Sequence, residues 1–127
     1  MKSIMMVALG GALSCVARYE FGALVLQYTI GWKFPAGTFL VNVLGCLIAG
    51  GIIGVAEHHN FLTPEVRLLT FTGFLGGFTT FSAFGIETVS LLQKGEWTVA
   101  AAYVFLSVAC GFAALWLALK VGGMTGD

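Results

Sequence analysis

The side chains best suited to binding a small ion lie in one stretch, residues 73–84, which reads GFLGGFTTFSAF. Phe81 and Phe84 are three residues apart and therefore share one face of a helix. Because the edge of an aromatic ring is positive, the edges of such a pair can meet a small anion and offer nothing to a cation. The chain has 11 phenylalanines, so core packing or lipid contact is the alternative interpretation of this pair.

The same stretch is unfavourable for a regular helix, because Gly76-Gly77 is followed by two threonines. Irregular backbone at membrane depth is tolerated where it is buried in protein or lines a cavity. Carbonyl groups exposed by a helix break can bind a cation. The alternative is a close helix crossing, in which glycines permit the approach and threonine hydroxyls bond back to the preceding turn.

Three polar residues interrupt other apolar segments. Arg18 lies about 14 residues into the first one, roughly 21 Å along a helix, and it either reaches the far interface or faces a watery cavity. Asn42, in GTFLVNVLG, either joins two helices by hydrogen bonds or orients an ion in transit. Glu87 lies three residues after Phe84 and extends its face, and a carboxylate in hydrocarbon is a functional candidate.

Tyr103 and Ser107 are four residues apart in the last apolar segment and can form a polar strip. A tyrosine near the end of a span is alternatively an interfacial anchor. The sequence contains no pattern typical of a nucleophile with its base, a phosphate-binding loop or a metal-ligand cluster. We therefore expect no enzymatic activity.

Composition indicates the class of protein that positions these residues. Of 127 residues, 58% are hydrophobic and 9% are charged, whereas a soluble domain has about 25% charged residues. The sequence predicts an all-α integral membrane protein, a single four-helix domain over residues 1–127 whose third helix is broken near its centre. The expected spans are about 4–28, 36–55, 66–92 and 97–121, and short loops predict antiparallel packing in sequence order. Thr63 and Pro64 are typical of an N-cap and a first helical residue.

The basic residues that flank the spans give almost no bias in orientation. Lys2, Arg67 and Lys120 fall on one side of the membrane, and Lys33 and Lys94 on the other. Orientation requires a clear excess on the cytoplasmic side. A single extra cation is one sufficient explanation; the other is dual topology, in which copies insert both ways and pair head-to-tail.

Taken together, these segments resemble the Fluc or CrcB-type family of small microbial fluoride channels over essentially the whole chain. The motifs are GGALSCVARY with Arg18, GTFLVNVLG with Asn42, GFLGGFTTFSAFGIE, and Tyr103 with Ser107. Ala83 and Gly85 depart from the hydroxyl residues common at those positions in the family.

The resemblance implies an antiparallel, dual-topology homodimer in the bacterial inner membrane that passes fluoride and rejects chloride. It implies that Phe81 and Phe84 line the fluoride path, that Asn42 hydrogen-bonds the ion, and that Arg18 lies near a vestibule. It also implies a structural Na⁺ at the dimer centre, held by the carbonyls of Gly76 and Thr79 from both subunits. The remaining polar residues of the path would be Thr38, Ser82, Glu87, Tyr103 and Ser107.

Two other classes remain open on the residues alone. A small proton-coupled multidrug exporter would use Glu87 as its proton and substrate site, and it has no need of the glycine-threonine break or Asn42. A membrane subunit without transport activity would tolerate replacement of Arg18, Asn42 and Glu87. A fluoride channel accounts for more of these features than either.

Overall fold

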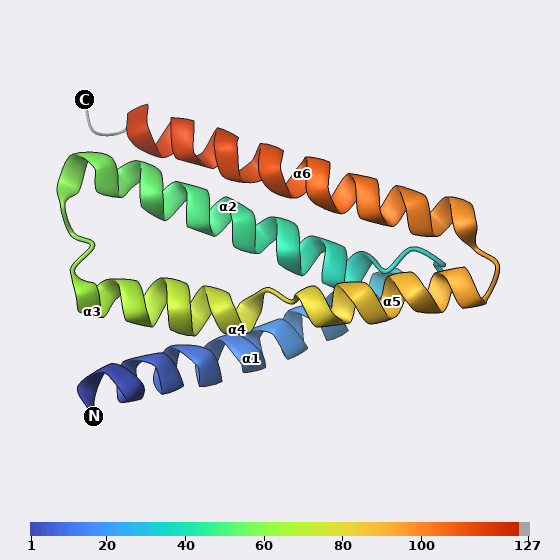
Figure 1. Ribbon diagram of the computed structural model, residues 1–127, viewed down its shortest axis with the longest axis horizontal. Helices are drawn as coiled ribbons and strands as arrows, with labels where there is room; N and C mark the ends of the chain where they lie inside the picture. Colours follow the sequence, from blue (N-terminus) through green and yellow to red (C-terminus); the bar gives the residue numbers. More distant parts are fainter. Residues whose placement is uncertain (125–127) are drawn as a thin grey trace.

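The computed structural model describes residues 1–124, which form helices joined by short loops (Figure 1). Four helical stretches are long and apolar enough to cross a membrane. This confirms the prediction of an all-α, multi-pass membrane protein. The elements are α1 (Lys2–Tyr28), α2 (Ala36–His59), α3 (Pro64–Arg67), η1 (Leu68–Leu75), α4 (Gly76–Phe78), α5 (Phe81–Gln93) and α6 (Trp97–Met124).

The third span consists of four of these elements and contains two irregularities. It begins as the sequence predicts, with the Thr63 hydroxyl accepting a hydrogen bond from the Val66 amide at 3.3 Å and Pro64 in the first turn. The following η1 segment is a π-helix, in which each turn holds an extra residue. The helix then breaks at Thr79 and Thr80, which are both extended.

The position of the break corrects one detail of the sequence interpretation. Gly76 and Gly77, whose low helix propensity indicated a break, are themselves helical in α4. Glycine instead serves close packing here, because a Cβ on Gly77 would collide with the Ser14 hydroxyl of α1. The backbone leaves the helix only at the two threonines that follow.

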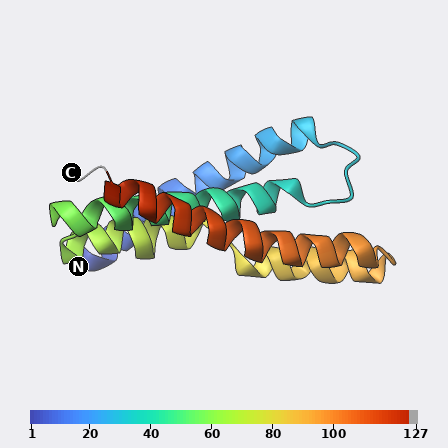
Figure 2. The same cartoon turned by 90° about the horizontal axis from the view of Figure 1, so that it is seen from above.

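Consecutive spans run in opposite directions, but the closest packing is between parallel ones. Helix α1 lies along η1 and α4, and α2 lies along α6 (Figures 1 and 2). A Cβ on Gly73 would lie 3.0 Å from the Val7 carbonyl oxygen, and one on Gly50 would collide with the Leu115 carbonyl. The prediction of packing in sequence order was therefore wrong, since small residues bring alternate spans together.

Two loops meet at one end of the molecule. Lys33, between α1 and α2, forms an ion pair with Glu96, before α6, at 2.7 Å. Gly31 and Gly95 have positive φ angles of 86° and 78°, a conformation that glycine adopts without strain. Beneath these loops, a buried cluster of Leu91, Ala100 and Tyr103 holds α5 against α6.

Candidate functional site

The carboxamide of Asn42 binds the backbone of the helix break. Its Oδ1 accepts a hydrogen bond from the Thr80 amide at 2.8 Å, and its Nδ2 donates to the Thr80 carbonyl at 3.0 Å. Asn42 lies in the first third of α2, so this pair of bonds ties α2 to the third span at the point where that span is irregular. The Thr80 amide is therefore satisfied without a helical acceptor.

The break changes the partners of two preceding carbonyl groups. In a continuous α-helix, the Thr80 amide would bond to the Gly76 carbonyl and the Ala83 amide to the Thr79 carbonyl. Here the Thr80 amide bonds to Asn42, and the Ala83 amide bonds to the Thr80 hydroxyl at 3.2 Å. The Gly76 and Thr79 carbonyls are therefore released from the helical hydrogen-bond pattern.

Thr80 is also the N-cap of α5. Its hydroxyl accepts the bond from Ala83 and lies 3.4 Å from the hydroxyl of Ser82, which is exposed. The first residues of α5 thus place hydroxyl groups and backbone amides at the same point as the Asn42 carboxamide. Donors of this kind at the start of a helix favour an anion.

Glu87 is held by hydroxyl groups from two other helices. The Thr38 hydroxyl of α2 donates to Glu87 Oε1 at 2.7 Å, and the Tyr103 hydroxyl of α6 donates to Oε2 at 2.8 Å. Tyr103 has no exposed surface. These two contacts fix the carboxyl group at the junction of α2, α5 and α6.

Aromatic rings form a continuous series beside this carboxylate. The Phe81 and Phe84 ring centroids are 5.9 Å apart, and those of Phe84 and Tyr103 are 5.0 Å apart. The Phe34 ring then meets Tyr103 edge-on at 5.4 Å. Phe84 is therefore held by its neighbours, whereas Phe81 at the start of the series has 84% of its surface exposed.

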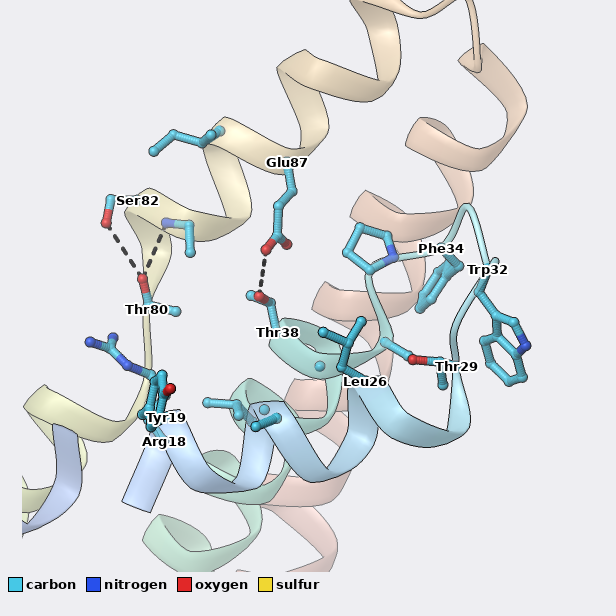
Figure 3. A pocket seen from close by; sticks show the side chains of 18 of the residues that line it. Arg18, Tyr19, Leu26, Thr29, Trp32, Phe34, Thr38, Thr80, Ser82 and Glu87 are labelled. Carbon is cyan, nitrogen blue, oxygen red and sulfur yellow. Dashed lines mark hydrogen bonds between the residues drawn. The ribbon is translucent and has the colours of Figure 1, made fainter. Parts of the chain in front are cut away.

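A cleft of about 800 Å³ lies between α1, α2 and α5 (Figure 3). Thr38 and Glu87 point toward one another across it, and Thr80 and Ser82 line the wall formed by the break. Arg18 lines the same cleft from α1. A cationic group and several hydroxyl donors thus face one space at the depth of the helix break.

Comparison with known proteins identifies the family. Residues 5–119 match the family described as CrcB-like protein, Camphor Resistance (CrcB). The chain belongs to the CrcB-like family. A relative from Methylobacillus flagellatus, named fluoride-specific ion channel FluC, is 47% identical over 98% of each chain. Relatives with the same name from Nitratidesulfovibrio vulgaris and Acidobacterium capsulatum are each 44% identical, over 96% and 91% of this chain and 98% and 92% of their own.

The fold of this CrcB-like chain brings most of the predicted site residues together around the break and the cleft. Ser107 differs from the others. Its hydroxyl oxygen is buried and has no hydrogen-bond partner within residues 1–124, so it does not join the bonds around Glu87. The residues that do gather here are Arg18, Thr38, Asn42, Gly76, Thr79, Phe81, Ser82, Phe84, Glu87 and Tyr103.

Two contributors to this region of the CrcB-like chain were not among the residues predicted for the site. Thr80 is the partner of Asn42 and the cap of α5, and a threonine before a helical segment is a signal that sequence reasoning can find. Phe34 lies in the loop before α2 and contacts Tyr103 of α6, which is far from it in the sequence. No periodicity or spacing links Phe34 to Tyr103 in the sequence.

Proposed function

We propose that this protein is a fluoride-selective ion channel that lets fluoride leave the cytoplasm down its electrochemical gradient. The observation that favours it most is the position of Phe81 and Phe84 directly after the break that Asn42 holds. The names of the relatives support the same ion. A multidrug exporter centred on Glu87 receives no comparable support, since both carboxylate oxygens already accept hydrogen bonds.

The chemistry of fluoride explains why such a site suits it. A small, tightly hydrated anion requires several close donors to replace its water, and each must be weak enough to release the ion. The Asn42 amide, the Ser82 hydroxyl and the positive edges of Phe81 and Phe84 are donors of that kind. In this proposal Arg18 raises the local concentration of anions in the cleft, and Thr38, Glu87, Tyr103 and Ser107 continue the polar path.

The proposal includes a second copy of the chain inserted in the opposite orientation. Phe81 is 84% exposed in the isolated chain, so one wall of a path along Phe81 must come from elsewhere. A head-to-tail copy related by a two-fold axis in the membrane plane supplies that wall and creates two equivalent paths. The weak orientation bias of the flanking basic residues supports this arrangement, which we assign to the bacterial inner membrane.

The proposal also includes a structural Na⁺ between the two copies. The donor set is suitable, because the Gly76 and Thr79 carbonyls are hard oxygen ligands released from the helical pattern. These carbonyls would hold the cation, with the same pair from the second copy. A bound cation supplies a positive charge that offsets the low dielectric around a passing anion.

Anion efflux from liposomes tests the function directly. Purified protein is reconstituted into vesicles loaded with potassium fluoride or potassium chloride, and valinomycin is added to let K⁺ follow the anion. Rapid fluoride release with chloride retained is the expected result. Retention of both anions by folded protein would refute the channel, and equal release of both would refute the selectivity.

A further inference from the structure

The side chain of Asn42 replaces the helical acceptor of the Thr80 amide and also donates to the Thr80 carbonyl. In a regular helix one backbone group bonds to the turn before and the other to the turn after. At Thr80 both groups bond to the Asn42 carboxamide, at 2.8 Å and 3.0 Å. At membrane depth an unpaired backbone group is costly, so this contact removes the penalty that an unpaired Thr80 amide would carry.

The same contact determines whether the Gly76 carbonyl has a hydrogen-bond donor within the helix. The Thr80 amide is the group that would bond to Gly76 if the helix continued. While Asn42 Oδ1 accepts that amide, the Gly76 carbonyl is free to meet another ligand. Without the Asn42 acceptor, we expect the Thr80 amide to return to the Gly76 carbonyl and the helix to close.

We infer that Asn42 is a positioning residue for the cation site, in addition to any contact it makes with the anion. It acts through the backbone of Thr80 and keeps the Gly76 carbonyl available. The inference deepens the function proposed above and rests on it for the identity of the cation.

The Asn42 side chain can serve both ions because it has more than one hydrogen-bonding group. A carboxamide has two N–H donors and one acceptor oxygen. The oxygen and one N–H are engaged with Thr80, which fixes the plane of the group and the direction of the second N–H. That second donor is the one left to meet fluoride. The geometry therefore couples the cation site to the anion path through a single rigid group.

Thermal unfolding of the purified protein in NaCl and in N-methyl-D-glucamine chloride tests the inference. We expect Na⁺ to raise the unfolding midpoint of the wild-type protein. Asn42→Ala should lose this Na⁺-dependent shift, because the Thr80 amide loses its acceptor and the Gly76 carbonyl is no longer kept available. Asn42→Asp should retain only part of it, since a carboxylate accepts the Thr80 amide but cannot donate to the Thr80 carbonyl.

Phe81→Ile is the matched control, because Phe81 adjoins the break but its side chain makes no hydrogen bond to Thr80. It should lose fluoride efflux and keep the full Na⁺-dependent shift. A full shift in Asn42→Ala would refute the role of Asn42. No shift in the wild-type protein would refute the cation site, while fluoride efflux from liposomes would still decide the channel separately.

Amide hydrogen exchange of the wild-type protein gives a second test that does not depend on a variant folding. Peptides covering residues 76–84 are followed in the two salts. Removal of Na⁺ should change exchange at the Thr80 amide, because the carbonyl geometry and the Asn42 contact are coupled. Identical exchange in both salts would contradict the coupling.

Discussion

At the scale of single residues, the aromatic series from Phe81 to Phe34 separates two kinds of phenylalanine. Phe84 is packed between Phe81 and Tyr103 and is fixed by the fold. Phe81 is largely exposed in the isolated chain. The packing of this chain therefore does not explain a large aromatic residue at position 81, whereas the proposed ion path along its edge would explain it.

Phe81→Ile should abolish fluoride efflux with little effect on folding, because isoleucine lacks the positive ring edge and position 81 is exposed. The measurement is liposome efflux, with size-exclusion chromatography to monitor folding. Phe112→Ile is the matched control, since Phe112 in α6 is 70% exposed, and we expect it to retain efflux. Equal efflux in both variants would remove Phe81 from the path.

Tyr103→Phe should destabilise the protein by about 1–3 kcal/mol, because one oxygen of Glu87 loses its donor in a partly buried setting. The ring contacts with Phe84 and Phe34 are retained, so the change isolates the hydroxyl. Unfolding of the detergent-solubilised protein measures the effect. Tyr19→Phe, at a residue 74% exposed, should leave the stability unchanged. Equal destabilisation by both variants would show that the hydrogen bond from Tyr103 to Glu87 does not contribute to stability.

At the scale of elements, the glycines of α2 decide how closely it approaches α6. Gly50 faces the backbone of Leu115, whereas the adjacent Gly51 has open space where a Cβ would be. Two neighbouring residues of one type therefore differ completely in their packing role. This contrast offers a direct test of the parallel pairing of α2 with α6.

Gly50→Ala should cost about 1–3 kcal/mol of stability, because the new Cβ forces the two backbones apart. Gly51→Ala should instead be neutral or gain up to about 1 kcal/mol, since alanine has the higher helix propensity. Unfolding midpoints of the two variants compared with the wild type provide the measurement. Similar destabilisation of both would contradict the packing described here.

The helix elements also mark the limit of prediction from sequence. The spans, the Thr63 cap and the family could be predicted, because hydropathy, caps and motifs are local properties. The exact position of the break could not be predicted, because it depends on Asn42, which lies 38 residues before Thr80. Likewise, local sequence showed that glycines such as Gly77 are poor helix formers, but not that α1 packs against them.

At the scale of the whole molecule, the distribution of basic residues governs insertion. Lys33 and Lys94 oppose Lys2, Arg67 and Lys120 across the expected membrane. Lys33 also pairs with Glu96 on the surface, a bond worth about 0–1 kcal/mol. Its main effect in the proposed antiparallel dimer is therefore on orientation rather than stability.

The double variant Lys33→Gln with Lys94→Gln should insert in a single orientation, because only one side then keeps flanking basic residues. Antiparallel pairing and fluoride efflux should both be lost. Labelling of a terminal cysteine from each side of the membrane measures orientation. The double variant Lys33→Arg with Lys94→Arg keeps the charges and should behave like the wild type; single orientation in the wild type would refute dual topology.

The π-helical segment Leu68–Leu75 has a consequence for the evolution of chain length. A π turn contains one residue more than an α turn, so deletion of one residue there can be absorbed by conversion to regular α-helix. A deletion within α2 has no such reserve, and it would rotate every following side chain by about 100°. Length variation among relatives within the third span should therefore fall between Leu68 and Leu75, upstream of the break.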